Sequence, residues 1–340
     1  MKFIIAIVNT KAWLFICLIF CLLMQSCFKD IDTEKMPSQQ TITAGYNIQE
    51  TQYFYKIDDN GIRFVKVIAP ESWDLLFENG DSGWQIKLNY STGAKIINTG
   101  FSTMDQISPE MVSDLKLSAD WKFDHPNGSP DSIALVNWQT NNNVYLLNRG
   151  QGFLPDSTFY LFQFITSDTE KYIISYTPVS NPTNAVVKTV NKTTETYFTA
   201  FSITSNKVVD MEPVKIDWDL LFTPYQGYYK TASIYAPYFL SGVFTNSRAG
   251  VEVAEIRNPE ILFENISVAN INQVVFTNAQ DEIGYDWKLI PSLENAIYYV
   301  DTNLKYLIKS GNQQYYKLRF VSFYNDKGEK GYPVFEYAKL

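Results

Sequence analysis

Few residues in this sequence are of a type, and at a spacing, that would allow them to take part in catalysis or metal binding. The chain has one histidine, His125, so a second acid-base role has no imidazole partner. Two carboxylates, Asp74 and Asp219, occupy the same place in a Trp-Asp-Leu-Leu-Phe stretch that occurs twice. Each aspartate belongs to its own copy of the stretch, so we expect each to accept hydrogen bonds that fix a turn or a strand edge. The tryptophans before them, Trp73 and Trp218, are expected to be core residues.

Sequence motifs of enzymes are otherwise missing. The chain has no G-x-S-x-G, no H-E-x-x-H, no phosphate loop and no glycine-rich dinucleotide turn. A glycosidase with two carboxylates needs no fixed spacing along the chain, so a surface hydrolase stays open as the least favoured function. We therefore expect a protein that binds a ligand without catalysing a reaction.

The first 26 residues have the features of an export signal. The apolar run AWLFICLIFCLLMQS is flanked by lysine and ends on a small residue, a pattern typical of a signal peptide and not of a membrane span. Ser26 before Cys27 resembles the lipobox of bacterial lipoproteins, which implies that Cys27 is acylated and anchors the chain in a lipid bilayer. An ordinary secretory signal with a chance cysteine is the alternative. The mature chain then has no disulfide, because every cysteine lies in or at the end of the signal: Cys17, Cys21 and Cys27.

The residues after the signal predict a tether and a location. We expect residues 27–48 to connect the lipid to the folded part. The stretch FKDID, which starts at Phe28, resembles the signal that sends some lipoproteins to the outer face of the outer membrane. Surface display is therefore expected, with the periplasmic face as the alternative. The net charge is −8 and no basic run stands out, which makes nucleic acid a poor candidate partner.

Most of the chain is a tandem duplication. Around WDLLF, at 73–77 and 218–222, further pairs recur in the same order: YFYKI with YFTAFSI, DWKF with DWKL, VYLLN with KYLIK, and YLFQF with YKLRF. The offset between partners drifts by a few residues, as it does between homologous domains that differ by loop insertions. We predict copy one at 49–177, a linker at 178–192 and copy two at 193–340.

Local periodicity predicts strands in both copies. Aromatic residues make up 16% of the chain, which suits half-buried pleated surfaces. Stretches such as STFYLFQFIT and QQYYKLRFVSFY place alternate residues on two faces, and turn signals such as DDNG and HPNGSPD separate them. No long amphipathic helix is evident. The predicted fold is all-β, with two tandem homologous antiparallel β-domains.

Three ordered elements of copy two resemble the HmuY family of all-β haem-binding surface lipoproteins. They are YFTAFSITSNKVVD, DWDLLF and the closing KYLIKSGNQQYYKLRFVSFYNDKGEKGY, and copy one carries a weaker version. The resemblance extends from about Tyr53 to the C-terminus. It implies two HmuY-like domains, haem or another tetrapyrrole as ligand, and a haem-carrying protein or an outer-membrane receptor as partner.

The resemblance also implies axial ligands on the haem iron, two histidines in the founding type and methionine in some relatives. A single histidine excludes a bis-His site within one molecule. The remaining candidates are His125, Met111 and Met211. Met104 aligns with Phe263, so we expect it to pack in the core. The alternative function is an interaction module that keeps the fold, has lost the haem ligands, and recognises a glycan, a peptide or a partner protein.

Overall fold

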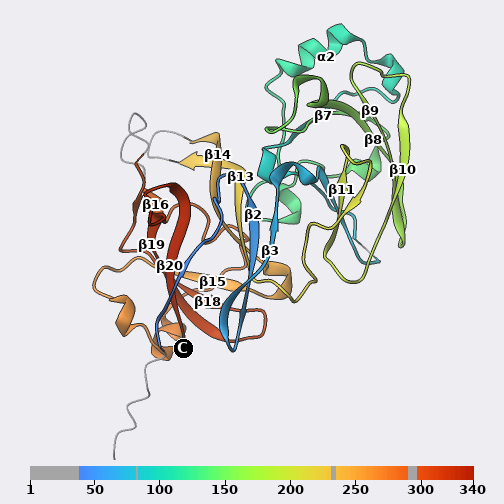
Figure 1. The fold of residues 1–340 in the computed structure, drawn as a ribbon. Helices are drawn as coiled ribbons and strands as arrows, with labels where there is room; N and C mark the ends of the chain where they lie inside the picture. The colour runs from blue at the N-terminus through green and yellow to red at the C-terminus, as the bar shows by residue number, and fades with distance from the viewer. Residues whose placement is uncertain (1–37, 82, 231–234, 290–296) are drawn as a thin grey trace, which may run out of the picture. The chain divides into compact units, whose positions relative to one another are not determined.

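The computed structural model of this chain describes residues 38–340, apart from 82, 231–234 and 290–296. The predicted export signal, Cys27 and the first part of the predicted tether lie outside the described residues. Within the described part of the chain, no helix has the length and apolar character needed to cross a membrane. The described residues form five antiparallel sheets and one α-helix (Figure 1). The expected all-β class is therefore confirmed.

The strands range from 2 residues in β16 and β17 to 11 residues in β13 and β14. Their bounds are β1 Gln40–Thr43, β2 Gln52–Asp58, β3 Gly61–Ile68, β4 Leu75–Glu78, β5 Ile86–Leu88, β6 Lys95–Asn98, β7 Val144–Asn148, β8 Phe159–Ser167, β9 Lys171–Pro178, β10 Val186–Asn191, β11 Phe198–Ser202, β12 Lys207–Val209, β13 Leu220–Lys230, β14 Tyr235–Thr245, β15 Glu252–Ile256, β16 Lys288–Leu289, β17 Tyr299–Val300, β18 Lys305–Lys309, β19 Tyr315–Tyr324 and β20 Lys330–Lys339.

Helical segments are few. The α-helix is α2 Pro109–Lys116, and Ser108 caps its N-terminus by accepting a hydrogen bond from the Met111 N–H. The 3-10 turns are η1 Pro70–Ser72, η2 Tyr90–Thr92, η3 Met104–Gln106, η4 Pro130–Ser132, η5 Trp138–Thr140, η6 Pro155–Ser157, η7 Ser247–Ala249, η8 Phe263–Asn265 and η9 Val268–Gln273.

Strand order shows how the two predicted copies combine. Two five-stranded sheets have the orders β1-β20-β19-β18-β15 and β10-β9-β8-β7-β6. Two four-stranded sheets have the orders β14-β13-β2-β3 and β12-β11-β4-β5. In the first of these, Tyr55 pairs with Leu220, and in the second, Phe201 pairs with Leu75. Figure 1 shows the blue β2 and β3 beside β13 and β14. The first hairpin of each predicted copy therefore pairs with the WDLLF strand of the other.

This exchange corrects the expectation that each copy folds as a contiguous domain. The hydrophobic alternation of a hairpin specifies which face is buried, but both copies carry the same pattern. This alternation alone therefore does not distinguish the two pairings. The boundaries of the repeats at 49–177 and 193–340 stay a prediction from the sequence.

Burial follows the exchange. One core cluster joins Tyr53 and Tyr55 of β2 to Phe222, Trp287 and Phe335 of the second copy. A second cluster joins Leu75 and Phe77 of β4 to Phe201 of β11 and to Ile203, which follows that strand. A third, which we call the junction core, contains the aromatic residues Phe54, Trp73, Phe198, Trp218 and Phe244.

The core predictions from the sequence are confirmed. Trp73 and Trp218 are both buried in the junction core. Met104 is buried among Ile107, Val112 and their neighbours, so its thioether packs as hydrocarbon.

Asp74 and Asp219 fasten the exchanged hairpins. The Asp74 carboxylate accepts a hydrogen bond of 2.7 Å from the Ile203 N–H, and the Asp219 carboxylate accepts one of 2.7 Å from the Ile57 N–H. Their own N–H groups donate to the carbonyls of Phe201 and Tyr55 respectively, at 2.8 Å. The prediction that each aspartate fixes a strand edge is confirmed.

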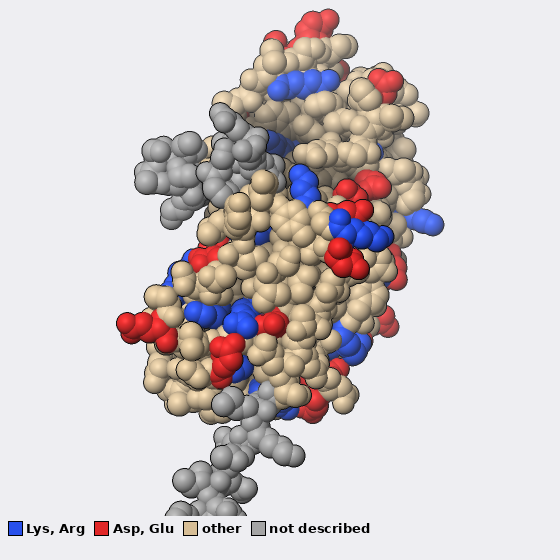
Figure 2. Space-filling view, turned by 60° about the vertical axis from the view of Figure 1, so that its left-hand side comes forward, with Lys and Arg blue, Asp and Glu red and all other residues tan. Residues whose placement is uncertain are grey.

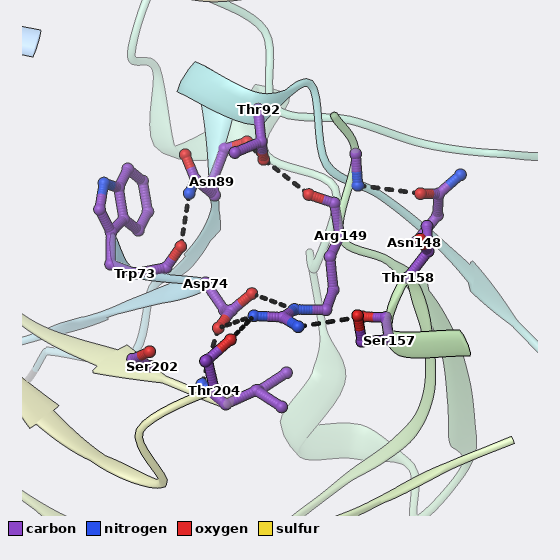
Figure 3. Close-up of polar contacts among 12 residues, drawn as sticks. Trp73, Asp74, Asn89, Thr92, Asn148, Arg149, Ser157, Thr158, Ser202 and Thr204 are labelled. Carbon is purple, nitrogen blue, oxygen red and sulfur yellow. Dashed lines mark hydrogen bonds and ion pairs between the residues drawn. The ribbon is translucent and has the colours of Figure 1, made fainter. Parts of the chain in front are cut away.

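The two aspartates have different counter-ions. Arg149 binds Asp74 through two hydrogen bonds, Nε to Oδ1 at 2.6 Å and Nη2 to Oδ2 at 3.0 Å (Figure 3). Burial raises the pKa of Asp74, and this neighbouring guanidinium opposes the rise. Asp219 instead receives Lys56 Nζ at 2.8 Å and the Gly311 N–H at 3.0 Å. Both buried carboxylates are therefore paired and hydrogen-bonded.

The predicted tether and linker are shorter than expected. Gln40–Thr43 forms β1 and pairs with β20, and Val186–Asn191 forms β10 and pairs with β9. An edge strand can form wherever its neighbour has unpaired backbone N–H and C=O groups. Its own sequence therefore need not show a clear hydrophobic alternation. Ile42 packs against the core and Val190 is fully buried, which fixes both edges.

Candidate functional site

A cavity of about 700 Å³ lies against the long β13–β14 hairpin. We call it the aromatic cavity because five aromatic side chains line it: Tyr229, Tyr238, Phe239, Tyr285 and Tyr298. Its volume falls within the range of roughly 300–1,000 Å³ that is usual for small-molecule sites. The cavity is therefore large enough for an organic ligand.

Strand register positions two of these tyrosines. Tyr229 on β13 lies opposite Ala236, and Tyr238 on β14 lies opposite Gly227, so the two tyrosines are diagonal neighbours. Their ring centroids are 5.8 Å apart. Diagonal pairs on one sheet face are within reach of aromatic side chains. The hairpin therefore presents an aromatic surface without help from another element.

A glycine brings the second wall of the cavity close to the hairpin. Val243 N–H donates to the Gly284 carbonyl at 2.9 Å, and Gly284 N–H returns a hydrogen bond of 3.1 Å to Val243. A Cβ at Gly242 would come within 2.2 Å of the Gly284 oxygen. Only glycine at position 242 allows this approach, which places the following Tyr285 and Lys288 beside the hairpin.

Lys288 is the buried cation of the aromatic cavity. Its Nζ donates to the Ser241 carbonyl at 2.5 Å and to Ser241 Oγ at 2.9 Å, and lies 4.6 Å from the Phe323 ring centroid. Burial lowers the pKa of Lys288 to about 7. An incoming carboxylate would favour the charged form and raise this pKa. The cavity can therefore hold a flat apolar ring on its tyrosines and an acidic group on its lysine.

The three candidate iron ligands do not line the aromatic cavity. Met111 lies on α2 with 39% of its surface exposed. Met211 is buried and lines a separate cavity of about 620 Å³ at the junction core. His125 lines a third cavity of about 400 Å³. The structure thus places the three residues in three different surroundings.

His125 is a loop residue held by its neighbours. Its Nδ1 accepts the Asn127 N–H at 3.2 Å, and its ring centroid lies 5.5 Å from that of Tyr228. The cavity that it lines also borders the aromatic cavity, since both include Leu240 and Tyr285. Across the described ranges there is no group of three or more His, Cys, Asp or Glu side chains arranged to hold a metal ion.

Sequence reasoning missed the aromatic cavity. The sequence indication of this cavity was the high number of tyrosines in the neighbouring stretches PYQGYYK and YAPYF. A tyrosine in a strand is more often half-buried packing than a ligand contact, so the pattern alone is not specific. Figure 2 shows acidic and basic side chains interspersed on one face of the molecule, with no large patch of a single sign. No charged patch on that face marks a ligand site.

Comparison with known proteins gives the family. Three solved structures are similar to parts of this chain. A proposed lipoprotein of Bacteroides fragilis NCTC 9343 has 13% identity and a TM-score of 0.22, and the match covers 91% of each chain. A proposed HmuY-like haem-binding protein of Bacteroides vulgatus ATCC 8482 has 11% identity and a TM-score of 0.21, and the match covers 90% of this chain and 93% of the other. Apo PinO of Porphyromonas gingivitis has 13% identity and a TM-score of 0.18, and the match covers 53% of this chain and 96% of the other.

These TM-scores are low, so the family assignment depends on sequence. No curated protein matches the chain. The sequence model of the HmuY protein family matches residues 28–337, which is nearly the whole chain. The chain belongs to the HmuY family.

Proposed function

We propose that this protein captures haem or another tetrapyrrole at the cell surface without catalysing a reaction, and that the ring is held in the aromatic cavity. Membership of the HmuY family supports a binding function. The observation that carries the choice of site is the set of five aromatic side chains around one buried lysine, Lys288. A porphyrin is flat and apolar on both faces and carries carboxylates on one edge, so it matches both features.

Stacking supplies the main attraction in this proposal. Aromatic rings attract one another beyond the area that they bury, by about 0.5–1.5 kcal/mol for each pair. A ligand carboxylate beside Lys288 would form a charge-assisted hydrogen bond. That contact raises the lysine pKa from about 7, so binding should take up protons and weaken as the pH rises above 7.

The lining fits the ring better than it fits the iron. The described side chains around the aromatic cavity include neither histidine nor methionine, so they offer no imidazole or thioether to an axial position. The ligand role predicted for His125, Met111 and Met211 stays a prediction. We therefore infer that recognition of the macrocycle, and not of the metal, dominates affinity.

The test is a titration of the mature protein with haemin, followed by the shift of the Soret band. The double variant Tyr229→Ala with Tyr238→Ala should bind at least tenfold more weakly. Tyr46→Ala is the matched control, since Tyr46 and Tyr238 have similar exposure, 39% and 46%, and Tyr46 stacks on Phe64 away from the cavity. The absence of a specific complex in either iron oxidation state would reject haem as the ligand. Tight binding by the double variant would place the ligand elsewhere.

We also propose that acylated Cys27 anchors the protein in the outer membrane. The lipobox-like sequence before Cys27 supports this assignment. Cys27→Ala should leave the protein unprocessed or released, because the variant lacks the residue that would carry the acyl chains. Stable anchoring needs more than one such chain. A processed form of the variant that stays with membranes after a carbonate wash would contradict the proposal. A haem-carrying protein and an outer-membrane receptor are the partners that this location allows.

A further inference from the structure

The two copies share a turn that makes their residues directly comparable. Asn89 Nδ2 donates to the Trp73 carbonyl, and Asn246 Nδ2 donates to the Trp218 carbonyl. A glycine in the left-handed region closes each turn, Gly93 at φ 72° and Gly250 at φ 82°. Counting along this turn, the residue after each asparagine is tyrosine in copy one and serine in copy two.

The exchange of tyrosine for serine opens a cavity. In copy one, the Tyr90 ring packs edge-on against Trp73, with centroids 5.2 Å apart. In copy two, Ser247 has no ring to place beside Trp218, and both residues line the cavity of about 620 Å³ at the junction core. We call this the junction cavity. Tyr90 lines the same cavity, which therefore lies next to the turn where the second copy has serine in place of tyrosine.

A second difference leaves a hydrogen-bond donor without a partner. Trp73 Nε1 donates to Gln52 Oε1 at 2.8 Å. Gln52 and Phe198 hold equivalent positions in the two hairpins. Each lies three residues before the residue that pairs with the first leucine of a WDLLF strand. Phenylalanine cannot accept a hydrogen bond. Trp218 Nε1 is accordingly shielded from solvent and has no partner among the described residues.

The junction cavity also contains a lysine that forms no ion pair. Lys87 lines the cavity with 9% of its surface exposed, and its Nζ makes no hydrogen bond or ion pair with any described residue. It lies 4.9 Å from the Phe198 ring centroid. Burial lowers the pKa of Lys87 to about 8. The carboxylates of Glu78, Glu212 and Asp124 act on the Lys87 charge from beyond ion-pair distance. Its three N–H donors are therefore open to a ligand anion.

The other charged side chains around the cavity are already occupied. Glu78 pairs with Arg248 at 2.7 Å and also accepts the N–H groups of Trp84 and Gln85. The Glu212 carboxylate accepts the Phe198 N–H at 2.9 Å, and burial raises its pKa to about 7. Of the four charged groups, Lys87 is thus the one left for a ligand.

We propose that the junction cavity binds a small carboxylate that carries hydroxyl groups. Carboxylate oxygens accept hydrogen bonds only, which suits the two unpartnered donors, Lys87 Nζ and Trp218 Nε1. Gln85 Oε1 is buried without a partner and lines the same cavity, so it calls for a donor such as a hydroxyl. The Trp218 and Phe244 rings supply an apolar wall for the carbon skeleton. This site is separate from the aromatic cavity and does not depend on tetrapyrrole binding.

The test uses the indole N–H resonances of ¹⁵N-labelled mature protein, with glucuronate and gluconate as probes and glucose as the neutral match. The resonance of Trp218, assigned by its loss in Trp218→Phe, should shift with both acids in a saturable way. The resonance of Trp73, which already has its acceptor, should stay in place and serves as the internal control. No shift with either acid would overturn the proposal, and an equal response to glucose would overturn the need for a carboxylate.

Two variants test the residues directly. Lys87→Met should weaken glucuronate binding at least tenfold, whereas Lys207→Met, at an exposed position, should have no effect. Ser247→Tyr restores the filler of copy one and should abolish binding. Undiminished affinity in Lys87→Met, with the fold intact by circular dichroism, would overturn the proposal. Haemin binding should be unchanged by Ser247→Tyr, so failure here is distinguishable from failure of the proposed function.

Discussion

Asp74 and Asp219 accept equivalent hydrogen bonds, each from the hairpin of the other predicted copy. Both bonds measure 2.7 Å, from Ile203 and from Ile57. The cations come from opposite sides of the exchange: Arg149 follows β7 in the same copy as its aspartate, whereas Lys56 lies on the incoming hairpin. One ion pair therefore acts within a copy and the other acts between copies.

The first prediction compares these two ion pairs. Arg149→Met should lower the free energy of unfolding by about 3–5 kcal/mol, because it leaves the buried Asp74 carboxylate without its cation. Lys56→Met should cost clearly less, since the Lys56 side chain keeps 12% exposure and Asp219 retains two N–H donors. Denaturant unfolding of each variant measures the difference. Equal losses would contradict the account of the two pairs.

The second prediction concerns the exchange of hairpins. A protease recognition sequence inserted at 181–184, in the turn between β9 and β10, allows the chain to be cut between the copies. The two fragments should elute together in gel filtration without denaturant, because each contributes a hairpin to a sheet of the other. As a control, the fragments should separate in urea. Separation under native conditions would show that the strands pair within each copy.

The third prediction follows from the pKa of Lys288, about 7 in the folded protein against an ordinary value of 10.5. Between these values the unfolded chain binds a proton that the folded chain lacks, so stability due to this group rises with pH from about 7 to about 10.5. Lys288→Met should therefore reduce the gain in Tm between pH 6.5 and pH 9. Lys207→Met is the exposed control and should keep the wild-type gain. A Lys288→Met protein with the full gain would contradict the assignment.

The sequence predicted the strands but not their partners. Alternation along Tyr160–Ile165 and Tyr315–Tyr324 identified β8 and β19, because the side-chain period of a strand is written in consecutive residues. The pairing of β2 with β13 depends on which of two similar hairpins lies beside that strand, and their alternation alone does not encode that choice. The strand β1 was not predicted for a similar reason. It pairs with β20 at the edge of its sheet, and Ile42 is its one residue that packs against the core.

The cavities were harder still to predict. The aromatic cavity combines Tyr229 and Tyr238 of a hairpin with Tyr285 and Lys288 of a distant loop, and the close approach depends on glycine at 242. Sequence reasoning looked for iron ligands, and His125 was prominent because it is the one histidine in the chain. The differences between the two copies were more informative. Copy two has Ser247 at the position of Tyr90 in copy one, and Ser247 lines the junction cavity.

The central claim is that the ring of the tetrapyrrole, and not its iron, is recognised in the aromatic cavity. The most direct measurement is a paired titration of the mature protein with haemin and with iron-free protoporphyrin, repeated on a variant with His125→Ala, Met111→Leu and Met211→Leu. The account predicts dissociation constants within about tenfold of each other for the two ligands, and little change in the triple variant. Tight binding of haemin alone, lost in the triple variant, would contradict the account and restore axial ligation as the basis of recognition.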